Sequence, residues 1–198
     1  MSAAAFAVLA EPTRRRILDL LRERARSVQD ATERFEEIYR RHRDAVAAYA
    51  RRRASATAAE DVVAETFLVC WRRLERVPDE PLPWLYAVAR KTLANQRRAA
   101  ARQATTEGGE RSADAAAFEG DPALGTAFAR LSERDREVLR LVAWEGLSLR
   151  AAAAVLGCSA VACRVRYHRA KRRLANRLDA LESRAAARPQ PDPKGATR

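Results

Sequence analysis

The chain has 198 residues, and its 38 Lys and Arg outnumber 26 Asp and Glu to give a formal net charge of +12 at pH 7. This length allows two compact helical modules with a small core each, and it excludes a large single-core enzyme domain. The positive excess calls for a polyanion or an acidic partner, and nucleic acid is the commonest one. Because membrane-binding and ribosome-associated proteins are also basic, charge alone leaves those classes open.

Cysteine and histidine are too few and too scattered to predict a metal site. Cys70, Cys158 and Cys163 form no Cys-x-x-Cys pair, and His42 and His168 complete no zinc-ligand spacing. An odd cysteine count, without a signal peptide or a long apolar run, indicates a soluble cytoplasmic protein with no membrane insertion. We expect all three cysteines to be buried as small hydrophobic residues.

Helical periodicity runs along almost the whole chain and predicts an all-α fold. The first amphipathic helix of a bundle is expected over residues 33–53. A second helix is expected to begin at Thr57, with Glu60 completing a capping box. Prolines between residues 78 and 83 end it, and Pro83 suits the first turn of a third helix. The outer face of that third helix carries Arg90, Lys91, Asn95, Arg97 and Arg98.

Beyond residue 102 the apolar stripe disappears into a small-residue, acidic stretch, which predicts a flexible linker. Ser132 is expected to begin the next helix, and a short helix from Ser148 to Leu156 follows it. Gly157 then supplies a left-handed turn residue, and Ser159 caps the last helix. The expected segments are an appended N-terminal helix (1–30), a first module (31–101), the linker (102–124), a second module (125–183) and a disordered tail (184–198).

Residues 148–173 have the layout of a helix-turn-helix. On a helical wheel, the face of the second helix that does not pack carries Val161, Arg164, Val165, His168, Arg169 and Arg172. Guanidinium groups read guanine edges in the major groove, and methyl groups touch thymine. A solvated cationic helix is the alternative, but the cap, the turn and the small-residue helix favour DNA binding. His168 lacks a ligand or catalytic partner at helical spacing, so a phosphate or base contact is expected.

The second module resembles region four of extracytoplasmic-function sigma factors. The resemblance rests on Leu131-Ser-Glu-Arg-Asp-Arg-Glu-Val-Leu, on Trp144-Glu-Gly-Leu-Ser and on Arg164-Val-Arg-Tyr-His-Arg. In that family the region binds the minus-thirty-five promoter element and contacts the polymerase flap. Ala162 stands where the family usually has Thr, and residues 151–154 replace a more acidic and β-branched helix, so the base preference is not carried over.

The first module is similar to region two of the same family, in the stretches Phe35-Glu-Glu-Ile-Tyr, Ala59-Glu-Asp-Val-Val and Pro83-Trp-Leu-Tyr. The resemblance implies that its second helix docks on the polymerase clamp helices, although Ala64 replaces the usual Gln. The clamp-facing candidates are Asp61, Glu65, Thr66, Arg72 and Arg73. Region two also captures a flipped base of the minus-ten element, for which the candidates are Trp84 and the outer face of the third helix. Core packing is the favoured role for Trp84, and Lys91 replaces a frequent family Asn.

The resemblance implies a protein without enzymatic activity and without a cofactor. It would bind core RNA polymerase at the clamp helices and flap, and select promoter DNA. An anti-sigma factor is a further candidate partner. The stretch Phe6-Ala-Val-Leu-Ala-Glu-Pro-Thr-Arg-Arg-Arg-Ile-Leu-Asp-Leu-Leu, residues 6–21, resembles the opening helices of ArsR-type winged-helix repressors. Because region two begins after Asp30, no complete winged helix is expected, and this helix would dimerise, shield the basic surface or have no role.

Two rival functions remain open from the sequence. An autonomous helix-turn-helix repressor would dimerise and hold operator DNA tightly without polymerase. A thiol or metal hydrolase would use Cys158, Cys163 and His168, and would lose its function when all three were changed to Ala.

Overall fold

The computed structural model describes residues 12–103 and 121–186, and within these ranges the chain is helical and contains no strand. The elements are α2 (Pro12–Arg51), α3 (Ala56–Arg72), the 3-10 turn η1 (Leu74–Arg76), α4 (Pro81–Gln103), α5 (Pro122–Ala129), α6 (Glu133–Ala143), α7 (Leu149–Leu156) and α8 (Ala160–Ala186). The predicted all-α class is confirmed. None of the described helices is both long and apolar enough to cross a bilayer.

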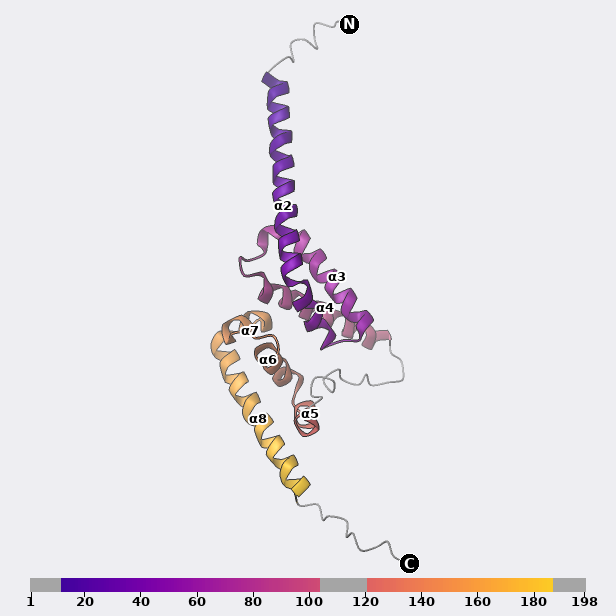
Figure 1. Ribbon diagram of the computed structural model, residues 1–198, viewed down its shortest axis with the longest axis vertical. Helices are drawn as coiled ribbons and strands as arrows, with labels where there is room; N and C mark the ends of the chain where they lie inside the picture. The colour runs from indigo at the N-terminus through magenta and orange to yellow at the C-terminus, as the bar shows by residue number, and fades with distance from the viewer. Residues whose placement is uncertain (1–11, 104–120, 187–198) are drawn as a thin grey trace, which may run out of the picture.

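Helix α2 is a single helix of 40 residues. Its N-terminal part projects beyond the other helices, and its C-terminal part packs beside α3 and α4 (Figure 1). The boundary expected at residue 30 therefore lies inside a continuous helix. Of the ArsR-like stretch, residues 12–21 belong to α2, and residues 6–11 lie outside the described part of the chain.

Helices α2, α3 and α4 form the first module. Its core contains Val46, Tyr49, Val62 and Leu85, each wholly buried. The capping box predicted at Thr57 is wrong, because α3 begins at Ala56 and Ser55 is its N-cap residue, without a side-chain hydrogen bond. Thr57 lies already within the first helical turn, where its hydroxyl no longer has the position of a cap.

Helices α5 to α8 form the second module, and its helix ends follow the sequence prediction. The hydroxyl oxygens of Ser132, Ser148 and Ser159 accept hydrogen bonds from backbone amides three residues further on, at 3.2, 3.2 and 3.1 Å. Gly157 ends α7 in the left-handed conformation, with φ 66° and ψ 38°. A side chain would be strained at this φ, so the glycine fixes the turn of the helix-turn-helix.

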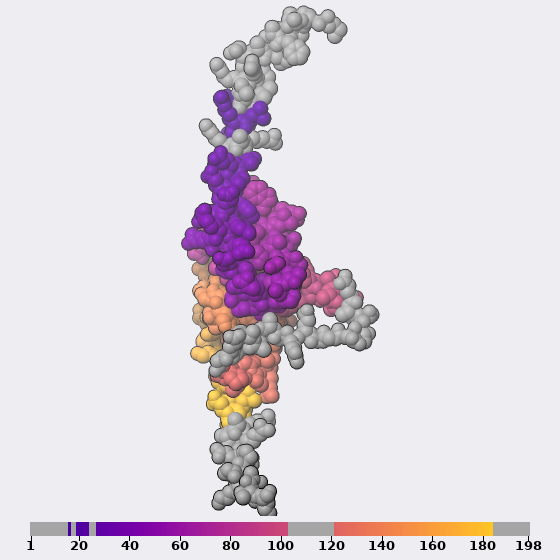
Figure 2. Space-filling model, turned by 45° about the vertical axis from the view of Figure 1, so that its right-hand side comes forward, coloured from indigo at the N-terminus to yellow at the C-terminus, as the bar shows by residue number. Residues whose placement is uncertain are grey.

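The two modules pack against each other through α4 and α7, and buried residues of both belong to one hydrophobic cluster (Figures 1 and 2). We call this packing the closed arrangement. It corrects the expectation of two separate small cores. Of the predicted linker, residues 102 and 103 belong to α4 and residues 122–124 to α5, while 104–120 lie outside the described residues. Helix α8 extends to Ala186, and the rest of the predicted tail lies outside them as well.

Candidate nucleic-acid interface

The solvent-facing side of α8 carries all six DNA-binding residues predicted in this helix. Val161 is 71% exposed and Val165 43% exposed. Arg164, His168, Arg169 and Arg172 are also exposed. The opposite side buries Cys163 and Ala170 completely. The structure thus has the predicted division into a packed and a free face, while the contact of this face with DNA stays a prediction.

Helix α8 is held firmly by the rest of the second module. Ala152, Ala153 and Val155 are buried, so α7 approaches α8 closely. Arg173 of α8 pairs with the buried Asp135 of α6, at 2.6 Å between Nη1 and Oδ2. The exposed side chains of α8 are therefore held in a fixed orientation relative to the rest of the second module.

The residues predicted on α4 divide between two hollows. Arg90, Lys91, Arg97 and Arg98 line a pocket of about 660 Å³ between the modules, which we call the inter-module pocket. Asn95 lines a groove of about 1080 Å³ between α3 and α4, and Lys91 borders both hollows. The groove also includes Asp61, Glu65, Arg73 and the half-buried Trp84, so it joins residues predicted for polymerase and for promoter DNA.

Two of the cations on α4 make contacts within the protein. Arg97 donates a hydrogen bond of 2.8 Å from Nη2 to the carbonyl oxygen of Arg53, and its Nη1 lies 3.7 Å from a carboxylate oxygen of Glu133. Arg98 donates to Asn95 on its own helix, at 2.7 Å. Arg97 therefore links α4 to the second module in the closed arrangement.

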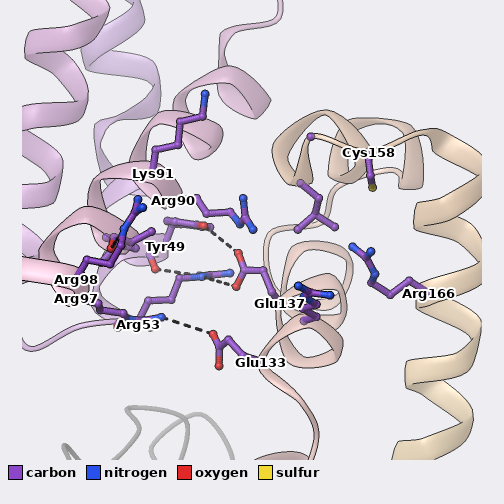
Figure 3. A pocket seen from close by; sticks show the side chains of 15 residues that line it. Tyr49, Arg53, Arg90, Lys91, Arg97, Arg98, Glu133, Glu137, Cys158 and Arg166 are labelled. Carbon is purple, nitrogen blue, oxygen red and sulfur yellow. Dashed lines mark hydrogen bonds and ion pairs between the residues drawn. The ribbon is translucent and has the colours of Figure 1, made fainter. Parts of the chain in front are cut away.

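A buried cluster of charges joins the end of α2 to α6 and the loop after it; Figure 3 shows its part formed by Tyr49, Arg53 and Glu137. Arg53, whose side chain is only 3% exposed, lies 3.0 Å from Glu137 and 2.9 Å from Glu145. The Tyr49 hydroxyl donates to Glu137 at 3.0 Å, and Arg52 also pairs with Glu145. Sequence reasoning missed this cluster, because its partners lie 84 to 93 residues apart.

The charge cluster is stable only while its partners stay together. Burial by itself lowers the pKa of Arg53, but Tyr49, Glu137 and Glu145 outweigh burial and raise it, so the guanidinium stays charged. It also lies over the Tyr49 ring, 3.6 Å from the centroid. For Tyr49, burial raises the pKa of the hydroxyl, so this hydroxyl keeps its proton and donates a hydrogen bond. Such a cluster adds little net stability, because water solvates the same charges when they are separated. Removing one partner while the others stay buried, however, lowers the free energy of unfolding strongly.

The clamp-facing candidates do not all lie on the surface. Asp61, Glu65 and Arg72 are exposed on α3, and Arg73, the C-cap residue of this helix, is exposed as well. Thr66 is wholly buried, and its hydroxyl donates to the carbonyl oxygen of Val62 at 2.6 Å. The structure therefore removes Thr66 from this surface, because residues 62, 66 and 70 share the packed face of the helix.

An exposed aromatic patch on α2 and α3 was not predicted. Tyr39, Leu68 and Trp71 are 39%, 41% and 45% exposed. Phe35 and Phe67 lie beneath them, and the ring centroids of Phe35 and Trp71 are 5.2 Å apart. Exposed apolar patches commonly mark protein interfaces. The signal in the sequence was two aromatic pairs at helical spacing, 35 with 39 and 67 with 71.

The cysteines and His168 do not come together as a catalytic site. Cys163 is buried toward the core, whereas His168 is exposed on the free face of α8. Burial raises the pKa of Cys163, and it raises the pKa of Cys70 to about 11, so neither thiol is an activated nucleophile. Cys158 is only half-buried, which corrects the expectation that all three cysteines are buried.

Comparison with known proteins agrees with the two modules. The family model for Sigma-70 region 2 matches residues 38–103, and the model for Sigma-70, region 4 matches residues 122–174. A structure of CnrH in complex with the cytosolic domain of CnrY is 31% identical, with a TM-score of 0.53, over 77% of this chain and 94% of that one. The sigma factor RpoE of Bartonella quintana, in complex with the anti-sigma factor NepR, is 23% identical, with a TM-score of 0.55, over 73% and 96%. A search of the curated proteins gave no match.

The all-α fold, with a helix-turn-helix module beside a second helical module, has the two domains of the sigma factor class of transcription proteins. The two matched regions and the 31% identical structure show that this chain belongs to the sigma-70 family, whose members act in transcription initiation. These findings support the extracytoplasmic-function type. The ArsR-like stretch lies outside both matched ranges and remains a prediction from the sequence.

Proposed function

We propose that this sigma factor binds core RNA polymerase and directs it to promoters, with α8 in the major groove of the upstream element. The observation that supports this most is the free face of α8. It combines exposed arginines with exposed valines on a helix anchored at Arg173 and preceded by the Gly157 turn. Guanidinium groups and small apolar side chains are suited to guanine edges and thymine methyls.

The polymerase-binding surface in this proposal is the exposed side of α3 with the aromatic patch. Asp61, Glu65, Arg72 and Arg73 supply charges. Tyr39, Leu68 and Trp71 supply apolar surface that is exposed to solvent in the free protein. Aromatic anchors with charges around them are typical of the energetic centre of protein interfaces.

The downstream promoter element would meet α4 and the groove between α3 and α4. Trp84 and Asn95 line this groove and could hold an unstacked base, while the cations of α4 follow the backbone. Because Arg97 contacts Arg53 and Glu133 in the closed arrangement, the modules have to separate before all of α4 is available.

An anti-sigma protein is a proposed further partner. In one similar structure RpoE is bound to the anti-sigma factor NepR, and in another CnrH is bound to the cytosolic domain of CnrY. The aromatic patch offers this chain a surface for a partner of that kind.

Transcription with purified core polymerase and a genomic DNA library tests the proposal. We expect promoter-specific transcripts that require this protein. Trp71→Ala should reduce association with core polymerase, whereas Arg164→Ala should leave association intact and reduce specific transcripts. Tight, site-specific binding of duplex DNA by the isolated protein, without association with the polymerase, would show that it is an autonomous repressor instead.

A further inference from the structure

The inter-module pocket contains more positive charge than its own acids neutralise. Seven cations and two carboxylates line it: Arg53, Arg90, Lys91, Arg97, Arg98, Arg134 and Arg166, with Glu133 and Glu137. Glu137 is occupied by Arg53 and Tyr49, and Glu133 by Arg136 and Arg140 of its own helix as well as Arg97. The remaining cations are therefore not balanced within the pocket.

Two of these cations approach each other from opposite walls. Arg90 extends from α4 and Arg166 from α8, and Figure 3 shows both side chains directed into the space between the modules. Both are half-buried, and no acidic residue pairs with either one in the part of the chain that the structure describes. Two like charges facing each other across a hollow favour a bound anion between them.

The wall of the pocket also contains an unsatisfied donor. Nη2 of Arg53 is buried and has no hydrogen-bond partner among the described residues. A buried donor without a partner costs free energy, and because this atom is not exposed in the closed arrangement, an acceptor oxygen would reach it only after a local side-chain movement. The same guanidinium already contacts Glu137 and Glu145 through its other nitrogens, so its position is fixed.

We propose that the inter-module pocket binds a phosphate-rich anion, such as inorganic triphosphate or the triphosphate group of a nucleotide, and that this anion stabilises the closed arrangement. Guanidinium groups bind phosphate oxygens in a bidentate manner, and they come here from both modules. A volume of about 660 Å³ is large enough for a small polyphosphate ligand. A ligand that binds only the closed arrangement shifts the equilibrium toward it by mass action.

Isothermal titration of the intact chain with sodium triphosphate, at constant ionic strength, tests this proposal. We expect one site per chain. Arg90→Gln and Arg166→Gln, from opposite walls, should each weaken binding at least about tenfold, the effect of losing one charge-assisted hydrogen bond. Arg41→Gln removes the same charge from an exposed position outside the pocket and should change affinity by less than about twofold. Thermal melts of the three variants show whether each is folded.

Small-angle scattering supplies a second readout. Triphosphate should lower the radius of gyration of the unmodified chain and of Arg41→Gln, and leave that of Arg90→Gln and Arg166→Gln unchanged. Equal losses of affinity in all three variants would indicate general ionic attraction and overturn the proposal. Binding of promoter DNA without binding of triphosphate would also overturn it, and assign these cations to the DNA backbone. Neither measurement contains polymerase, so its result is independent of the proposed transcription function.

Discussion

Helices α4 and α8 have similar cationic faces in the sequence but different surroundings in the folded chain. The face of α8 points into solvent, and its exposed residues extend from Val161 to Arg172. The face of α4 borders a pocket that residues of the second module line on the opposite side, and Arg97 pairs with Glu133 there. A helical wheel identifies both faces equally well, because it reports periodicity and not what lies opposite a helix.

Under the proposed function, in which both helices contact DNA, this difference implies an order of events. The cationic face of α8 is exposed to solvent in the closed arrangement. The face on α4 becomes fully available only after the charge cluster of Arg53, Glu137 and Glu145 has separated. Changes to the cluster should therefore alter the availability of α4, whereas changes to α8 should alter the reading of DNA directly.

The largest effect is expected from Arg53→Ala. It leaves Glu137 and Glu145 without their guanidinium partner, and breaking a buried ion pair costs about 3–5 kcal/mol when the partner stays buried. Urea unfolding should show a loss up to this size, and scattering should show an enlarged radius of gyration, because opening solvates the carboxylates. Arg51→Ala, an exposed neighbour, should stay within about 0.5 kcal/mol. An unchanged radius together with a loss below about 1 kcal/mol would contradict the proposed role of the cluster.

A smaller effect is expected from Arg164→Ala on the open face of α8. Loss of a guanidinium that reads a base should weaken promoter binding by roughly 1–3 kcal/mol and relax sequence choice at one position. Competition binding of the polymerase holoenzyme to promoter variants measures both quantities. An equal loss on every sequence would show that Arg164 contacts phosphate only.

Arg98→Ala on α4 should have an effect that depends on the state of the protein. For the free chain in the closed arrangement, affinity for duplex DNA should change by less than about 0.5 kcal/mol, as for an ordinary surface residue. For the holoenzyme on an opened promoter, one lost backbone contact should lower the slope of log affinity against log salt concentration by about 1. The same salt slope in holoenzymes with and without the substitution would remove Arg98 from the proposed DNA contacts.

The smallest effect is expected on the stability of the protein at acidic pH. Burial alone would raise the pKa of Glu133, but Arg140, Arg136 and Arg97 together lower it. A carboxyl whose pKa is lower in the folded state contributes stability above its unfolded pKa of about 4.5, and this contribution is lost as pH falls through the folded value. Urea midpoints between about pH 3 and 6 should show this loss, and Glu133→Gln should reduce it. Since the Glu133 side chain is 50% exposed, solvent limits its size. A pH profile unchanged by Glu133→Gln would disprove it.

Most helix ends of the second module were predicted correctly from local signals, whereas the capping box at Thr57 and all long-range pairing were not. Ser132, Gly157 and Ser159 act within one turn of their own position, so residue type and spacing sufficed to place them. Thr66 was assigned to the surface by family resemblance, although its spacing from Val62 and Cys70 already indicated the packed face.

The charge cluster had no local signal. Tyr49 and Glu137 are separated by 88 residues, and no sequence pattern near either residue indicates the other as its partner. An arginine run at residues 51–53 reads as a solvated end of a helix, yet the third arginine is buried. Only the docking of the two modules distinguishes Arg53 from Arg51, and docking depends on the whole surface of each module.

The continuous helix α2 connects the aromatic patch with the charge cluster. At about 1.5 Å per residue, this helix is a rod of roughly 60 Å. It carries Tyr39 on the aromatic patch and Tyr49 at the charge cluster, less than three turns apart. The patch and the contact between the modules therefore share one continuous helix, so a partner bound at the patch lies on the same element as Tyr49 without contacting the second module.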